Sequence, residues 1–215
     1  MKRPPRKRSN DSDSLALAVH SFLTALGRDP KQADLRETPE RVAQAWRHFT
    51  RGYQSSAADV FSEGVFEDSY DGMVLVRDID FFSVCEHHLV PFFGKCHVAY
   101  MPSRRVAGLS KIARLVELHA RRLQVQERMT RDIAHDLQAA LKPRGVAVRV
   151  EARHLCMAMR GVEKQNSYTI TSAMLGAFRD NARTRMEFLE LLKHRSGNTL
   201  SISATTPAGV SCLDE

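Results

Sequence analysis

The order of hydrophobic patterns in the middle of this chain constrains its fold more than any other feature of the sequence. Two strand-like segments are followed by two segments with the 3.6-residue period of amphipathic helices, and then by two more strand-like segments. In chain order these segments cover residues 73–82, 92–100, 110–121, 125–141, 146–155 and 167–171. The order predicts an α+β fold in which an antiparallel four-stranded sheet carries two helices on one face. The other face and the edges of such a sheet are left uncovered, which favours assembly into an oligomer.

The segments before this sheet predict an N-terminal helical arm. Apolar residues recur at helical spacing over residues 14–26, and Gly27 stands where a helix C-cap is expected. Thr38-Pro39-Glu40 offers a capping hydroxyl, a proline at the first helical position and an acid in the first turn, which predicts a second helix. The expected organisation is a disordered basic tail over 1–13, the helical arm over 14–60, a folded domain over 61–195 that ends in a helix near 183–194, and a flexible tail over 196–215.

The net charge of +7 is concentrated at the N-terminus, where MKRPPRKR (residues 1–8) holds basic side chains and no acidic ones. The rest of the chain is therefore close to neutral and shows no basic face for nucleic acid. No apolar run approaches the ~20 residues that cross a bilayer, and the N-terminus lacks the apolar stretch of a secretory signal. We therefore expect a cytoplasmic protein without nucleic-acid or membrane partners. A docking or targeting role for the basic tail stays open.

Cys85 and Cys156 lie close to histidines, in segments that are far apart in the chain. Cys85 and His88 are close enough in sequence for a thiolate and an imidazole to bind one metal ion from a turn. Cys156 follows His154 at the end of a predicted strand. If Cys156 completes the set, two sulfurs and one nitrogen leave a position for water, as in catalytic zinc sites. His87 and His154 would then be available as acids or bases.

Other interpretations of these residues stay open at this point. A C-x-x-H pair alone is a weak signal, and Cys156 alone is more often a buried strand residue than a ligand. Cys85 and Cys156 could also form a disulfide without the metal. The chain has only 4 cysteines and no C-x-x-C pair, so a disulfide scaffold is not expected.

The start of the helix predicted at 110–121 has the features of an anion site. Ser110 stands at the expected N-cap, and the free N–H groups of a helix start attract anions. Lys111 and Arg114 share one face of this helix, and together with Arg160 they could bind a polyphosphate. A capped helix with solvated surface charges explains the same pattern, and the residues alone favour that interpretation.

The next predicted helix opens with QVQER (residues 124–128). The carboxylate of Glu127 could accept two N–H hydrogen bonds from a guanine edge. An acid near a helix N-terminus is also common for electrostatic reasons alone, since it interacts favourably with the helix dipole.

Several of these segments together resemble the signature segments of GTP cyclohydrolase I. In chain order they are CEHHLVPFFGK (85–95), GLSK (108–111), QVQER (124–128), HLCM (154–157), RGV (160–162) and the stretch 171–178. The similarity covers about residues 14–194. It implies the tunnelling fold, here an antiparallel four-stranded sheet with two helices, in a catalytic domain over 61–195. It also implies a homodecamer of two facing pentamers with active sites between subunits.

The resemblance implies a role for each matching residue. The implied zinc ligands are Cys85, His88 and Cys156. The implied catalytic residues are His87 and His154. The implied substrate contacts are Ser110, Lys111, Arg114, Gln126, Glu127 and Arg160, with Glu127 at the guanine base and Lys111, Arg114 and Arg160 at the triphosphate.

The reaction implied by the resemblance converts GTP and water to 7,8-dihydroneopterin triphosphate and formate, the first step of folate or tetrahydrobiopterin biosynthesis. A water activated by Zn²⁺ would attack C8 of guanine, His154 would protonate the neighbouring nitrogen, and His87 would assist opening of the ribose. Some members of the family work with a separate regulatory protein, and the sequence is compatible with either kind of member.

Three other functions fit the sequence less well. Zinc nucleotide deaminases carry H-x-E followed by P-C-x-x-C, and the second motif is missing from this sequence. A nucleic-acid-binding module with a structural zinc needs a fourth ligand and a basic face, and neither is visible. A catalytically silent homologue would not need the complete set of cysteines, histidines and Glu127.

Overall fold

The structure is a computed structural model that describes residues 13–193. Most of the expected basic tail, the end of the last expected helix and the whole expected C-terminal tail lie outside the described residues. The elements are α1 (Ser14–Ala25), α2 (Thr38–Phe49), η1 (Arg51–Gln54), α3 (Ala57–Val60), β1 (Val65–Glu67), β2 (Val74–Cys85), β3 (Pro91–Met101), β4 (Arg105–Ala107), α4 (Leu109–Ala120), β5 (Leu123–Gln124), α5 (Gln126–Leu141), β6 (Gly145–His154), α6 (Leu155–Ala158), β7 (Thr169–Gly176), α7 (Ala177–Asp180) and α8 (Ala182–Lys193).

The central sheet has the strand order β5-β2-β3-β6-β7. The four long strands pair antiparallel, as predicted. The prediction of four strands is wrong by one, because the two-residue strand β5 joins the edge parallel to β2 and pairs Gln124 with Cys85. Such a short strand carries no periodic pattern that a sequence could reveal. The architecture is the α+β tunnelling fold that the resemblance implied.

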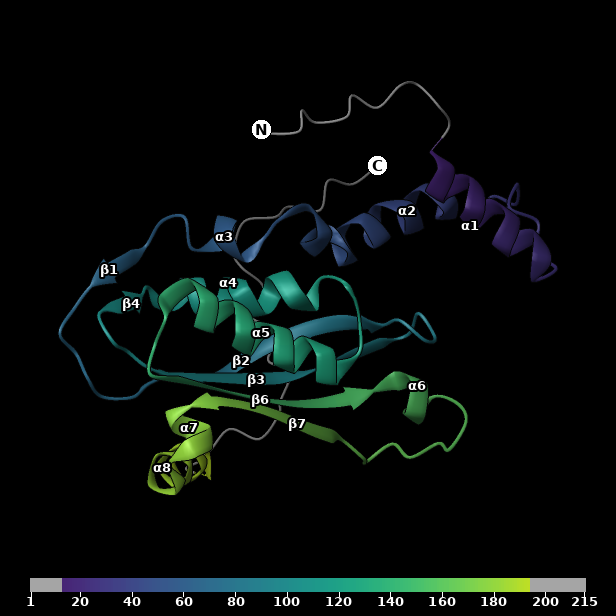
Figure 1. The fold of residues 1–215 in the computed structure, drawn as a ribbon. Helices are drawn as coiled ribbons and strands as arrows, with labels where there is room; N and C mark the ends of the chain where they lie inside the picture. Colours follow the sequence, from purple (N-terminus) through teal and green to yellow (C-terminus); the bar gives the residue numbers. More distant parts are fainter. Residues whose placement is uncertain (1–12, 194–215) are drawn as a thin grey trace, which may run out of the picture.

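Helices α4 and α5 cover one face of the sheet, as predicted (Figure 1). Their apolar sides supply Ile112, Leu115 and Ile133, which are fully buried against strand residues such as Val98 and Val148. The alternation of the strands explains this contact, because every second side chain of β3 and β6 points to the helices. The main core therefore lies between this face and the two helices.

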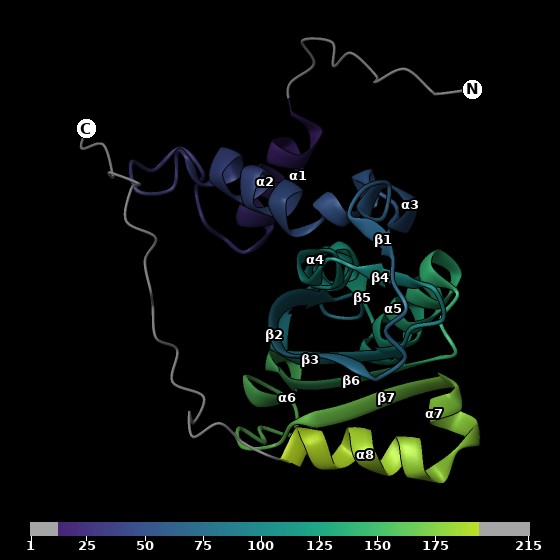
Figure 2. The same cartoon turned by 90° about the vertical axis from the view of Figure 1, so that its left-hand side faces the viewer.

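The opposite face of the sheet is partly covered, which corrects the expectation that it is bare. Helices α7 and α8 lie against it, on the side away from α4 and α5 (Figures 1 and 2). Phe178 and Phe188 are fully buried there and pack with Ala99 of β3 and Ala147 of β6. Within the described residues β7 pairs only with β6, so its outer edge is open as expected.

The N-terminal arm consists of α1 and α2, which pack against each other above α4 (Figure 2). Gly27 follows α1 with a φ of 75°, in agreement with its predicted capping role. Thr38 is the first residue of α2 and not its cap, because Glu37 occupies the N-cap position without a side-chain bond. The arm leaves Leu17, Phe22 and other large apolar side chains exposed.

The arm meets the domain through η1. The backbone N–H of Gly52 donates to the carbonyl oxygen of Arg121 at 2.8 Å. A Cβ at this glycine would lie 2.2 Å from the carbonyl oxygen of Leu118. A residue larger than glycine would therefore separate η1 from the end of α4.

Candidate metal centre and substrate site

A tight turn at the end of β2 carries two of the predicted metal ligands. Cys85 closes the strand: its N–H donates to the carbonyl oxygen of Val90 at 3.0 Å, and its own carbonyl oxygen accepts from the N–H of Leu89 at 2.9 Å. Leu89 has a left-handed φ of 54°, which turns the chain back into β3. The turn therefore fixes Cys85 at the sheet and leaves His88 exposed at its tip.

Strand β6 delivers the third predicted ligand. Its last residue, His154, pairs with Phe92 of β3, and the two rings stack at 4.6 Å between centroids. Cys156 follows in the single turn of α6. The ligand atoms of Cys85, His88 and Cys156 lie within 4.8 Å of one another. The predicted meeting of these two distant segments is therefore confirmed.

The electrostatics of this group favour a bound cation. Burial raises the pKa of the Cys156 thiol, and the nearby sulfur of Cys85 raises it further. Two thiolates at this separation repel each other, so both deprotonate readily only when a cation lies between them. Two sulfurs and one imidazole match the ligands of catalytic zinc. Both cysteines are free thiols, so the disulfide alternative does not occur.

A buried glutamine determines which nitrogen of His154 carries a proton. The side-chain amide nitrogen of Gln126 donates to the carbonyl oxygens of Val150 and Thr169 at 3.2 and 3.1 Å, and to the hydroxyl of Thr171 at 3.1 Å. Because the amide nitrogen faces carbonyl oxygens, its amide oxygen must be the atom 2.7 Å from Nε2 of His154. Nε2 therefore donates to Gln126, and Nδ1 is the nitrogen available for proton exchange.

The placement of Gln126 gives it a structural role in addition to the substrate contact that the resemblance implied. Its residue is only 2 % exposed, and its side chain is bonded to His154, β6 and β7. Gln126 is thus placed to orient the histidine, and its contact with substrate stays a prediction. The neighbouring Glu127 is exposed in the first turn of α5. Burial lowers the pKa of His154, and the carboxylate of Glu127 opposes this shift.

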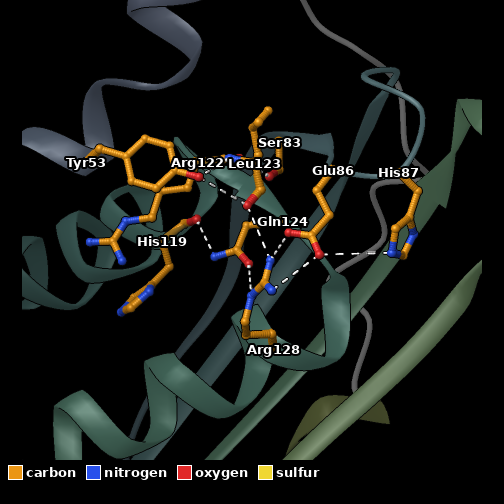
Figure 3. A network of polar contacts seen from close by, with 9 residues as sticks. All are labelled: Tyr53, Ser83, Glu86, His87, His119, Arg122, Leu123, Gln124 and Arg128. Carbon is orange, nitrogen blue, oxygen red and sulfur yellow. Dashed lines mark hydrogen bonds and ion pairs between the residues drawn. The ribbon is translucent and has the colours of Figure 1, made fainter.

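Arg160 and His87 lie at the same end of the sheet as the metal group. The positive charge of Arg160 counteracts the rise in the pKa of Cys156, so this arginine lies near the thiol. The side chain of His87 is 64 % exposed, with Nε2 at 3.9 Å from Oε1 of Glu86. Sequence reasoning gave Glu86 and Arg128 no role, although they bear opposite charges within two of the signature segments. Figure 3 shows that they form a direct pair beside the metal turn.

The predicted phosphate contacts Ser110, Lys111 and Arg114 lie at the other end of α4. This helix starts beside β4 (Figure 1), where the N–H of Gly108 donates to the carbonyl oxygen of Gly64 at 2.9 Å, and its other end contacts β5. With a rise of 1.5 Å per residue, Ser110 lies roughly 15 Å from the metal end of the helix. Within one chain, Ser110 and Lys111 therefore lie well away from the metal end of the helix, and Arg114 lies between, roughly 9 Å from that end.

The helix start itself differs from the prediction. Gly108 is the N-cap and α4 begins at Leu109, so Ser110 is exposed in the first turn and does not cap the helix. Arg114 lines a cavity of about 280 Å³ between η1 and α4, together with Arg51 and Arg121.

Among residues 13–193, no helix is both long and apolar enough to cross a membrane.

Comparisons with known proteins agree with these observations. The family model for GTP cyclohydrolase I matches residues 15–193. The chain is 52 % identical over 193 residues to GTP cyclohydrolase 1 of Homo sapiens, covering 89 % of this chain and 77 % of that protein. It is 52 % identical over 187 residues to GTP cyclohydrolase 1 of Gloeobacter violaceus, covering 87 % of each. It is 54 % identical over 182 residues to that of Chlorobium chlorochromatii, covering 85 % of this chain and 82 % of that protein.

Proposed function

Because the chain belongs to the GTP cyclohydrolase I family, we propose that it converts GTP and water to 7,8-dihydroneopterin triphosphate and formate with zinc as its metal. Membership of this family identifies the chain as an enzyme of the GTP cyclohydrolase I type. The observation that carries the specific reaction is the meeting of Cys85, His88 and Cys156 next to His154. We propose that this group and its neighbours form the reacting half of the site.

The three ligand residues fit a divalent ion of the zinc type. Cys85 and Cys156 would hold it as thiolates and His88 as a neutral imidazole, which leaves one position of a tetrahedral set open. Bound zinc would activate the water that attacks C8 of guanine. Its positive charge would also remove the repulsion between the two sulfurs that raises the pKa of Cys156.

His154 supplies a proton to the base nitrogen next to C8. Because Nε2 is held by Gln126, the transferred proton has to leave from Nδ1, and the histidine must be an imidazolium before the transfer. Burial lowers the pKa of His154, and the carboxylate of Glu127 opposes this shift by favouring the charged form. Protonation of the nitrogen allows its bond to C8 to break, and a second hydrolysis releases C8 as formate.

Glu127 and His87 act on the two parts of the nucleoside. Glu127 accepts N–H hydrogen bonds from the Watson–Crick edge of guanine, which holds C8 at the metal end of the sheet. His87, exposed on the turn, assists opening of the ribose. Arg160 near Cys156 binds phosphate oxygens, and the intact triphosphate anchors the substrate while the base reacts.

The remaining phosphate contacts come from another copy of the chain. Ser110 and Lys111 lie roughly 14–15 Å from the metal end of their own helix, and Arg114 lies roughly 9 Å from it, which supports a role at the metal group of a neighbouring subunit. The open edge of β7 and the exposed apolar residues of the arm support such assembly, which we propose to be a homodecamer. Residues 14–60 then act as an arm and residues 61–195 as the catalytic domain of each subunit.

The proposed reaction is the first step of pterin biosynthesis. GTP is a cytoplasmic metabolite, and the proposal accordingly places the protein in the cytoplasm. Its partners are GTP and further copies of the same chain, with no role for nucleic acid or membrane.

The direct test is incubation of the purified, zinc-loaded protein with GTP. The proposal expects one formate per GTP and, after oxidation, one fluorescent pterin that still carries three phosphates. A GTP analogue with carbon in place of N7 is the control, because it lacks the nitrogen that His154 protonates and should release no formate. Release of phosphate without formate would show a different reaction.

A further inference from the structure

Glu86 lies between metal ligand Cys85 and His87, on the turn that joins β2 to β3. Its backbone N–H donates to the carbonyl oxygen of Gln124 at 3.1 Å, which continues the pairing of β5 with β2 past Cys85. The backbone of the turn is therefore attached to β5 on one side. Its side chain extends toward the start of α5 (Figure 3).

The side chain of Arg128 binds Glu86 with both terminal nitrogens. Nη1 donates to Oε1 at 3.3 Å, and Nη2 makes a close contact with Oε2. Nε donates to Oε1 of Gln124 at 3.2 Å, and Nη2 also reaches the carbonyl oxygen of Leu123 at 3.4 Å. A planar guanidinium that engages both carboxylate oxygens allows little variation in their relative orientation.

Gln124 provides a rigid support for this arginine. It is a buried residue, and its amide nitrogen donates to the carbonyl oxygen of His119 at the end of α4, at 3.0 Å. Since the amide nitrogen is used there, the amide oxygen faces Nε of Arg128. The hydrogen bond to Gln124 on β5 thereby holds the guanidinium of Arg128 in the orientation in which it contacts Glu86 (Figure 3).

The position of Arg128 on α5 connects the two sides of the proposed site. It stands in the first turn of the helix, directly after Gln126, which orients His154, and Glu127, which is proposed to bind guanine. Glu86 stands on the turn with Cys85 and His88. The pair Glu86–Arg128 thus joins the metal-binding turn to the helix start that carries the substrate side of the site.

We propose that Arg128 and Glu86 are positioning residues that set the distance and orientation between the metal-binding turn, with His87 on it, and the guanine-binding start of α5. This inference rests on the proposed function. A role in overall stability is a poor explanation, because the two side chains are 39 % and 32 % exposed, and exposed ion pairs contribute little to folding. Their effect is instead expected on the chemical step, which is sensitive to small displacements.

The experiment is a double-mutant cycle in the zinc-loaded, assembled protein. It compares the unchanged chain with Glu86→Gln, Arg128→Gln and the double variant, and measures kcat and KM for GTP and zinc per chain. Arg128→Lys keeps the charge without the two-pronged contact. Arg131→Gln is the matched control, because Arg131 lies on the same helix and pairs with its neighbour Asp132.

Each single variant is expected to lower kcat by roughly 10- to 100-fold, with KM changed by less than about threefold and zinc retained. The double variant should be no slower than the slower single variant, because both remove the same contact. Arg128→Lys should recover little, since an ammonium cannot bind both oxygens in one plane. Arg131→Gln should resemble the unchanged protein.

Additive losses in the double variant, or unchanged kcat in the single variants, would overturn the inference. A second measurement does not depend on turnover, namely the rate at which zinc is lost to a chromogenic chelator. The unchanged protein, in which Arg128 holds the turn, should release zinc several-fold more slowly than either single variant. The double variant should release zinc at the same rate as the single variants. If the unchanged protein makes no formate, the proposed function fails, and the release rates alone decide on the pair. Equal release rates in all four proteins would then overturn it.

Discussion

The two ends of helix α4 differ in how they contribute to the site. At its C-terminal end, Cys85, His88, Cys156 and His154 come from distant segments and are brought together by the pairing of β2, β3 and β6. At its N-terminal end, the phosphate-binding candidates Ser110 and Lys111 are neighbours on one helical turn, roughly 14–15 Å from the other end. On the proposed function, folding of one chain builds the half that performs chemistry and binds the guanine base, and association adds further contacts to the triphosphate.

The largest expected effect comes from removing a ligand at the metal end. In Cys156→Ser, a hydroxyl that stays protonated near neutral pH replaces a thiolate, so we expect zinc to be lost and formate release to fall by more than about 10³-fold. Metal analysis and the formate assay measure both. Cys96→Ala is the matched control, because this thiol is buried inside the sheet and helix core. Full turnover by zinc-free Cys156→Ser would show that the metal end of α4 is not where the chemistry takes place.

Loss of the proton donor at the same end should leave the metal in place. We expect His154→Ala to retain zinc and to lower kcat by roughly 10²- to 10⁴-fold, the usual contribution of general acid catalysis. His135, an exposed histidine on α5, gives the control variant His135→Ala. If His154→Ala lost zinc as well, the histidine would belong to the ligand set and not to proton transfer.

A substitution at the other end of α4 should affect binding more than chemistry. Lys111→Ala removes a charge-assisted hydrogen bond to phosphate, worth about 1.5–3 kcal/mol, so the KM for GTP should rise by roughly 10- to 100-fold. The kinetics with guanosine, which has no phosphate, should change little. Equal effects on the kinetics with GTP and with guanosine would show that Lys111 does not bind the triphosphate.

Mixing two variants tests directly whether the halves come from different copies. Chains with Cys156→Ser lack the metal half, and chains with Lys111→Ala lack the phosphate half. After dissociation and reassembly, some sites should combine two intact halves, so activity at low GTP should exceed the sum of the separate variants. Activity equal to that sum would mean that each site is built from one chain.

The smallest expected effect lies away from both ends, at His97 on the opposite face of the sheet. His97 is buried, and its Nδ1 accepts from the N–H of Asp78 at 3.1 Å. Burial lowers the pKa of His97, against the attraction of Asp78 and Glu151, while Arg149 and Arg77 lower it further. The folded protein therefore holds this proton less tightly than the unfolded chain does.

This difference predicts a loss of stability as the pH falls below the ordinary histidine pKa of about 6.5. His97→Asn keeps an acceptor for the N–H of Asp78 and cannot be protonated, so the decrease should be smaller in this variant. A change of about 1 kcal/mol moves the Tm of a chain of this size by about 2–4 °C, and we expect an effect of that order. Thermal melting between pH 7 and pH 5 measures it. Parallel melting curves for both proteins would contradict the assignment.

The metal half of the site could be predicted from the sequence for a physical reason. A C-x-x-H turn after one strand and a cysteine after another place their ligands at strand ends, and antiparallel pairing brings such ends together. The long strands and helices could be predicted because each buries one face and shows the matching period. The predicted first residues of the helices were less accurate. Thr38 and Ser110 were each expected to cap a helix, but both lie inside its first turn, because helix boundaries are defined only to within one or two residues.

Other features depend on contacts that no local pattern records. Strand β5 has only two residues, and it forms because the chain between α4 and α5 runs beside Cys85. The orienting role of Gln126 follows from carbonyl oxygens on β6 and β7, which are distant in sequence. The pair Glu86–Arg128 links two signature segments whose separation is fixed only by the tertiary fold.

The proposed ligands are divided between a hairpin turn and the end of a later strand, which would set a folding order for metal uptake. Cys85 and His88 come together as soon as the hairpin of β2 and β3 closes, which is a local event. Cys156 arrives only after β6 has docked on β3 in its final register. On the proposed function, an incompletely folded chain would therefore offer two ligands and hold the ion weakly, and tight retention would mark a completed sheet.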